Sequence, residues 1–202
     1  MKNALALRMR TCWAGFKAVV VFTAIAIAYT LLMVGIGQLG FPSQANGSML
    51  TNGEGEVVGS SLIGQSFTDA NGRALPQYFQ SRPSAAGDGY DASASGATNK
   101  GHQDEELISS VEERRAAIAE REGVDVDDVP ADAVTASASG LDPHISPEYA
   151  AIQVERVAEA RGLSVDQVEE LVRLNTTGRG LGFIGEPVVN VVTLNLALDE
   201  LA

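Results

Sequence analysis

The chain has 202 residues, of which 45% are hydrophobic and 20% are charged, enough for one domain of ordinary size and a short additional segment. Its 26 acidic and 14 basic residues give a formal net charge of −12, a sign that argues against binding to the phosphates of DNA or RNA. One cysteine, Cys12, cannot form an internal disulfide, and two histidines cannot complete a His/Cys zinc cage.

Near the N-terminus, residues 18–37 form a run of 20 residues without a charge. A helix of that length covers about 30 Å, the thickness of the hydrocarbon core of a bilayer. We therefore predict a transmembrane anchor helix over residues 16–38. Two alternatives are a buried core helix and a cleaved signal peptide, for which 43–45 (Ser-Gln-Ala) has the small residues of a cleavage site. The run exceeds the roughly 7–15 apolar residues of a signal peptide, which favours the anchor.

The charges that flank the predicted span indicate its orientation. Lys2, Arg8, Arg10 and Lys17 precede or begin it, and the first charge after it is Glu54. The excess of bases predicts that residues 1–15 are cytoplasmic and that residues 39–202 form an extracytoplasmic domain of a cell-membrane protein. Residues 46–202 hold 26 acids and ten bases, a net charge of −16, which would attract small cations. A salt-rich habitat or a need for solubility would select the same composition.

Beyond the anchor, short apolar segments alternate with glycine and polar residues. The pairs at 57–58 and 62–63 predict short strands separated by turns. Residues 84–103 are poor in large apolar side chains and predict a long loop, either mobile or ordered by a partner.

Three helices are predicted from the residues at their ends. Polar N-cap residues, a proline at the first helical position and a glycine after the last turn are the expected signals. They place helices at 104–122, followed by Gly123; at 147–161, between Ser146 and Gly162; and from the capping box of Ser164 and Gln167 onward.

The C-terminal stretch 187–194 is rich in β-branched residues and predicts a strand, after which Asn195 could cap a short helix over 196–201. The whole pattern predicts the α+β class: one N-terminal transmembrane helix plus a single domain with a small sheet and several packed helices.

Evidence for catalysis in the residues is limited. A serine hydrolase would use Ser137 or Ser139 with His144 and Asp142, but the segment lacks a G-x-S-x-G elbow, and a turn braced by prolines explains it as well. The glycine-rich stretch 178–182 is not a P-loop and is more typical of a turn before a strand. The acidic run 125–132 does not have calcium-loop spacing and predicts a solvated face.

Several stretches in order along the chain resemble the C subunit of the bacterial Kdp potassium-transporting P-type ATPase. They are residues 41–48, 59–67, 78–85, 130–147, 153–161, 178–187 and 190–199. Together with the single anchor they cover nearly the whole chain. The loop 95–101 departs from the family pattern, as do Asn175 and Val188.

The resemblance implies a non-catalytic subunit of a potassium uptake pump, with no cofactor assigned to this chain, since ATP and potassium are handled by the complex. It implies three partners, a channel-like potassium-translocating subunit, an ATP-hydrolysing P-type subunit and a small single-helix subunit, and contact with membrane lipid. The family is described as raising the ATP affinity of the hydrolytic subunit. Because that site is cytoplasmic and the predicted domain is not, we expect the subunit to stabilise assembly of the complex and to cap its exterior face, with only an indirect effect on ATP binding.

Candidate contact or scaffold residues are Arg82, Asn99, Gln153 and Arg161. The membrane-anchored serine hydrolase is the alternative.

Overall fold

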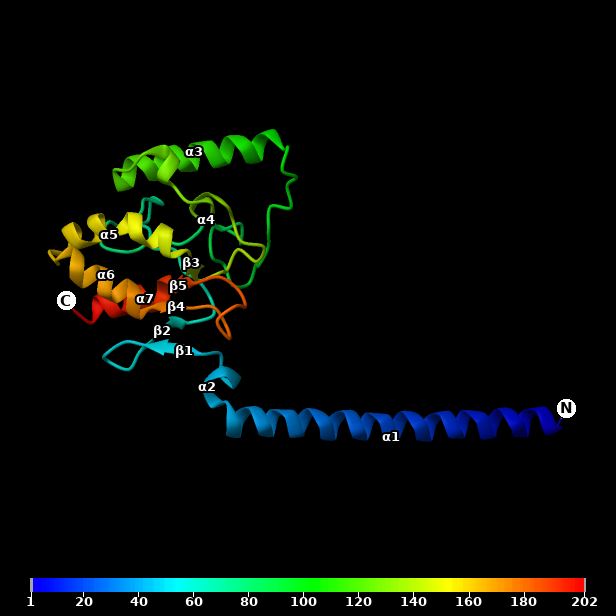
Figure 1. Cartoon of the computed structure of the whole chain (residues 1–202). Coiled ribbons are helices and arrows are strands. Elements are labelled where there is room, and N and C mark those ends of the chain that lie inside the picture. The colour runs from blue at the N-terminus through cyan, green and yellow to red at the C-terminus, as the bar shows by residue number, and fades with distance from the viewer. Residues whose placement is uncertain (1, 202) are drawn as a thin grey trace. The chain divides into compact units, whose positions relative to one another are not determined.

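The computed structural model describes residues 2–201, without the side chains of Lys2, Asn3 and Leu5. Contacts divide the chain into two units, one up to Ser48 and one from Met49 onward. Figure 1 shows one long helix in the first unit and a mixture of helices and short strands in the second. This mixture confirms the predicted α+β class.

Helix α1 (Lys2–Gly40) contains the predicted membrane span. Its part from Ala6 to Gly40 is 35 residues long and is apolar enough to cross a membrane. At 1.5 Å per residue it extends about 52 Å, more than the roughly 30 Å of the hydrocarbon core. Its large apolar side chains are exposed, so α1 is not a core helix. A short helix, α2 (Pro42–Ala45), follows, and the side-chain amides of Gln38 and Asn46 bond to each other across the turn.

The second unit contains two small antiparallel sheets. In the first, β1 (Met49–Thr51) pairs with β2 (Val57–Ser60). In the second, the strand order is β3-β5-β4, with bounds His144–Ile145, Val188–Asn190 and Thr176–Thr177. The strand predicted at 57–58 lies in β2, but the one predicted at 62–63 is wrong. The chain turns there: the N–H of Ile63 donates a hydrogen bond to the carbonyl of Ser60, and the two residues form an isolated β-bridge instead of a strand.

The helices predicted from their end signals are confirmed as α3 (Glu105–Glu122), α5 (Pro147–Arg161) and α6 (Val165–Leu174). The side chain of Asp104 caps α3 by accepting from two backbone N–H groups, and Ser164 and Gln167 form the capping box of α6. Helices α3 and α5 each end at a glycine in the left-handed conformation. Two more short helices, η1 (Val126–Asp128) and α4 (Ala131–Val134), follow α3.

The C-terminal helix begins earlier than its sequence pattern predicts. Helix α7 spans Val191–Asp199, so the predicted strand over 187–194 ends at Asn190, which is itself the N-cap. The β-branched run was wrongly predicted as a strand because α7 is almost wholly buried. A buried helix has no polar face, so its sequence lacks the alternation of apolar and polar residues that identifies a helix. Asn195 is not a cap but a buried residue inside α7.

Helix α5 lies at the centre of the domain, between α3 and α6 (Figure 1). In the core, the buried face of α5 packs against side chains from β5, α6 and α7. Phe79, from a segment outside any helix or strand, packs there too. The largest fully buried side chains are Tyr149, Phe79, Ile145, Leu194 and Leu198. Two fully buried amides, Gln153 and Asn195, belong to the same interior.

The predicted long loop, 84–103, contains no helix or strand. It is attached to the rest of the domain by its own side chains: the Ser84 hydroxyl donates to the carbonyl of Gly140 (2.6 Å) and Ser95 to that of Ser139 (2.9 Å). Gly140 has a φ of 68°, and a Cβ there would lie 2.7 Å from the Ala86 nitrogen. Glycine is therefore required where the two loops meet.

Candidate functional site

The polar side chains of the interior converge on residues 76–82, a segment without regular structure that crosses the domain. Gln153 pairs with Gln80 as a strand would, accepting from its N–H (2.7 Å) and donating to its carbonyl (3.3 Å). Asn195 pairs in the same way with the N–H and carbonyl of Phe79 (2.9 and 3.0 Å). The two amides thus satisfy buried backbone groups that no sheet reaches.

A buried carboxylate joins α3 to this segment. The fully buried side chain of Glu122 accepts from Arg156 Nε (2.8 Å) and Arg121 Nε (2.5 Å). Arg156 continues to the carbonyls of Pro76 and Tyr78 (2.6 and 3.0 Å) and to Gln153 Oε1 (2.9 Å). Each buried charge therefore has an opposite charge and further hydrogen bonds, the condition under which a buried ion pair is tolerated.

Arg161 holds the other end of the segment. Its guanidinium donates to the carbonyls of Gln77 (2.7 Å) and Leu198 (3.0 Å) and to Asp199 Oδ1 (2.7 Å). It also lies over the ring of Tyr78, 4.9 Å from the centroid. Burial, and then the charge of Asp199, raises the pKa of Tyr78. The end of α7 is thereby joined to the end of α5 and to the crossing segment.

Arg82 lies where the segment leaves the core. Its Nη1 pairs with Asp142 Oδ2 (3.0 Å), and its Nε and Nη2 donate to the carbonyl of Thr135. Asp142 also contacts His144 Nδ1 (3.3 Å). Burial alone would raise the pKa of Asp142, but the hydrogen bonds from His144 and the charge of Arg82 lower it overall.

Of the four candidate residues, Gln153, Arg161 and Arg82 all lie along the crossing segment, and Asn99 does not. Asn99 is exposed, with a φ of 53°, a conformation that asparagine tolerates better than most residues. Within residues 2–201 its side chain has no hydrogen-bond partner. Sequence reasoning missed the other members of the network, Glu122, Arg156 and Asn195. Their only signal is a polar residue at a position where helical spacing predicts a buried face.

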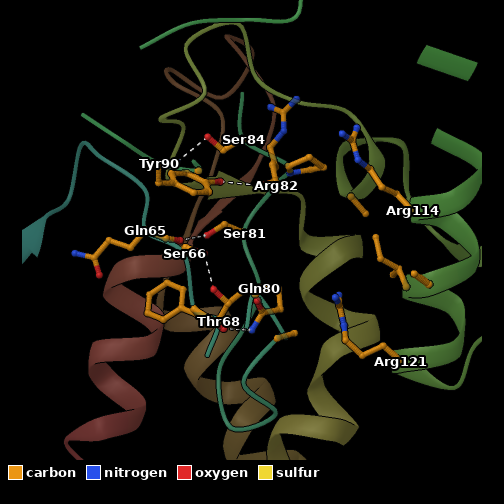
Figure 2. A pocket seen from close by; sticks show the side chains of 18 of the residues that line it. Gln65, Ser66, Thr68, Gln80, Ser81, Arg82, Ser84, Tyr90, Arg114 and Arg121 are labelled. Carbon is orange, nitrogen blue, oxygen red and sulfur yellow. Dashed lines mark hydrogen bonds between the residues drawn. The ribbon is translucent and has the colours of Figure 1, made fainter. Parts of the chain in front are cut away.

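A pocket of about 340 Å³ lies beside the crossing segment, against α3. Its walls come from residues 65–68, 72 and 74, from residues 80–84, 89 and 90, from the α3 side chains of Arg114, Ala117, Ile118 and Arg121, and from Ala133 and Tyr149. Figure 2 shows Arg121 below Arg114 on one side of the pocket, with Gln80 and Ser81 on the other. Arg114 Nη1 donates to the carbonyl of Val134 (3.1 Å), the neighbour of the carbonyl bound by Arg82.

The hydrolase alternative finds no support in the serine hydroxyls. Ser137 accepts from the N–H of Gly140 (2.9 Å) and Ser139 from that of Leu141 (3.1 Å), so both hold the turn 137–141. In the described part of the chain no hydrogen bond joins either hydroxyl to His144. The acidic run is not wholly solvated either, because Asp132 accepts from both the N–H and the hydroxyl of Ser146 (2.7 Å each).

The glycine-rich stretch 178–182 forms the turn between β4 and β5, as predicted. The turn presents three apolar side chains to solvent, Leu181, Phe183 and Ile184, which are 84%, 72% and 56% exposed. We call these three residues the apolar tip. Leu181 has a φ of 52°, a left-handed conformation that is unfavourable for a leucine. Arg179 and Glu186 form an ion pair at the base of the turn.

Comparisons with known proteins agree on one family. Residues 12–200 match the family model of KdpC, described as the K+-transporting ATPase, c chain. The chain is 50% identical to the potassium-transporting ATPase KdpC subunit of Kineococcus radiotolerans over all of both chains. It is 51% identical to that of Mycobacterium tuberculosis over 90% of this chain and 93% of the relative. It is 54% identical to that of Gemmatimonas aurantiaca over 87% and 85%.

Proposed function

Since the chain belongs to the KdpC family, the c chain of the potassium-transporting ATPase, we propose that α1 anchors it in the cell membrane and that its acidic domain docks on the exterior face of the pump. A KdpC subunit is an accessory subunit of the potassium uptake complex, and another subunit carries the catalytic activity. The proposed partners are the channel-like potassium-translocating subunit, the ATP-hydrolysing P-type subunit and the small single-helix subunit. Any effect on ATP hydrolysis then crosses the membrane through α1 and these partners.

The proposed orientation rests on the distribution of charge. All four bases of residues 1–45 lie at or before the start of the apolar run, and every acid lies after it. Bases near a span remain on the cytoplasmic side. Residues 39–202 are then outside the cell, on the side from which potassium enters.

The single cysteine allows a direct test of this orientation. Cys12 is exposed and lies in the predicted cytoplasmic segment. A membrane-impermeant maleimide should leave it unlabelled in intact cells and label it after lysis. In a variant carrying Cys12→Ser and Ala92→Cys, the exposed position in the long loop should be labelled in intact cells. The reverse pattern would overturn the orientation, and a mature chain without Cys12 would identify α1 as a cleaved signal peptide.

The apolar tip is the observation that carries the docking proposal. Three large apolar side chains on one turn are costly to leave in water, and burying a Leu or Phe is worth about 1.5–3 kcal/mol each. Their backbone is held in place by two hydrogen bonds between the backbone groups of Gly180 and Ile184 (2.8 Å each) and by the β4–β5 pairing, so the turn keeps these side chains exposed to solvent. An apolar recess on the exterior surface of a partner subunit would complement it.

Co-purification tests the docking. In a chain with Leu181→Ser and Phe183→Ser, we expect recovery of the other subunits after mild detergent extraction to fall at least tenfold, since a binding hot spot is worth about 2 kcal/mol or more and about 1.4 kcal/mol is tenfold. The control is Val126→Ser, which removes an apolar side chain that is 49% exposed in η1. Equal recovery with the double variant and the control would overturn the tip as the docking surface.

A further inference from the structure

The pocket beside α3 has a charge opposite to that of the domain that contains it. Three arginines line it, Arg82, Arg114 and Arg121, and no acidic residue does. The domain as a whole has 26 acids and ten bases from residue 46 onward. We propose that this pocket is a binding site for a small oxyanion, a ligand with a phosphate or carboxylate group.

The charges around the pocket do not balance. Asp142 pairs with Arg82, while Glu122 is shared between Arg121 and Arg156. Arg114 has no ion pair within residues 2–201. The four guanidinium groups thus meet two carboxylates, both of which lie outside the pocket lining. An anion in the pocket would supply the missing negative charge, and arginine is well suited to a planar or tetrahedral oxyanion.

The walls also retain hydrogen-bond donors. Arg114 uses one N–H of Nη1 on the carbonyl of Val134, which leaves four of the five N–H groups of its guanidinium as donors. The hydroxyls of Ser66 and Thr68, on the opposite wall, lie 3.1 Å apart and share one hydrogen bond. One of the two hydroxyl hydrogens therefore remains for a ligand.

The volume fixes the size class of the ligand. About 340 Å³ is at the lower end of the range for small-molecule sites, larger than a phosphate ion alone requires and too small for a folded partner. A ligand here would contact α3 and two segments from earlier in the chain at once. We therefore expect it to hold α3 against the crossing segment and to stabilise the domain against unfolding.

Two neighbouring alanines of α3 provide a matched test. Ala117 lines the pocket and Ala116 does not, and both are exposed. Ala117→Glu places a carboxylate three residues from Arg114 and four from Arg121, on the same helical face, where it would occupy the site in place of the ligand. Ala116→Glu makes the same change in net charge outside the pocket.

The experiment is calorimetric titration of the purified full-length chain, in detergent at low ionic strength, with inorganic phosphate and with succinate. We expect saturable binding of at least one of them, a loss of about tenfold in affinity with Ala117→Glu, and a change below about twofold with Ala116→Glu. The bound ligand should raise the unfolding temperature of the wild-type chain and of Ala116→Glu only. Binding of phosphate alone or of succinate alone identifies which oxyanion the site takes.

Two results would overturn the proposal: no saturable binding of either anion below about 10 mM, well beyond the affinity of a built site, or equal losses with Ala116→Glu and Ala117→Glu. If Ala117→Glu fails to fold, Arg114→Gln replaces it, with the same expected loss, because Arg114 is the pocket-lining arginine that has no carboxylate partner within residues 2–201.

Discussion

At the scale of single residues, the side chain of Gln153 makes the backbone hydrogen bonds that a neighbouring β-strand makes in a sheet. It is fully buried, and both ends of its amide pair with the backbone of Gln80. Its oxygen also accepts from Arg156, which places the amide between the crossing segment and the buried carboxylate of Glu122. Because the members of this network bond mainly to one another, the loss of one side chain leaves several buried polar groups without partners.

We expect Gln153→Leu to lower the free energy of unfolding by about 2–4 kcal/mol. The leucine fits the volume but leaves the N–H and carbonyl of Gln80 unsatisfied, and each such group costs about 1–3 kcal/mol. Denaturant unfolding of the full-length chain in detergent measures the change. The control is Gln103→Leu at an exposed position, which should stay within about 0.5 kcal/mol of wild type. A Gln153→Leu chain as stable as wild type would show that the amide pairing contributes nothing.

At the scale of elements, the parts of the fold that could be predicted are those specified locally. Helices α3, α5 and α6 carry their own caps and glycine stops, so a short window of sequence is enough to place them. Strand β3 was missed, and the beginning of α7 was misplaced, because both depend on the pairing of β3 with β5, which lie far apart in the chain. Asn190 is at once the last residue of β5, opposite His144, and the cap of α7.

The same distinction applies to the candidate site. Arg82, Gln153 and Arg161 were predicted only as polar contact or scaffold positions, and the groups that they contact were not predicted. Gln153 meets a backbone 73 residues away, and Arg161 meets one 84 residues away. No spacing along the sequence encodes such pairs. The pocket was missed for the same reason, since Arg82 and Arg114 meet only through the adjacent carbonyls of residues 134 and 135.

The cap of α7 can be tested with two substitutions of one residue. Asn190 Oδ1 accepts from the N–H groups of Val192 and Thr193, while its Nδ2 donates to the carbonyl of Ser61 (2.8 Å). Asn190→Ala removes both functions and should cost about 2 kcal/mol of unfolding free energy, roughly half from each. Asn190→Asp keeps the acceptor and should recover the part due to the cap. Equal losses in denaturant unfolding of the two variants would mean that the cap has no energetic role.

At the scale of the whole molecule, charge separates the two units more sharply than any motif does. Residues 1–45 contain four bases and no acid, whereas the remainder has a net charge of −16. A field of that sign outside the membrane would raise the concentration of potassium near the pump, an effect that salt screens over about 10 Å at 0.1 M. Composition alone does not separate this role from solubility, but kinetics does.

We expect that reversing three exposed acids raises the apparent KM for potassium about threefold at low ionic strength, without changing the maximal rate. The change, Asp→Lys at residues 125, 127 and 128 together, leaves a domain charge of −10. A second variant with Glu→Lys at 112, 113 and 120 on α3 has the same charge, so a field of the whole domain predicts similar shifts for both.

Asp→Glu at the first three positions controls for side-chain replacement. Potassium-dependent ATPase activity of equal amounts of assembled complex provides the measurement, and choline chloride near 0.5 M should abolish the shift. An unchanged KM in both reversed variants would leave assembly as the role of the domain, and a shift in only one would indicate a local contact instead of a field.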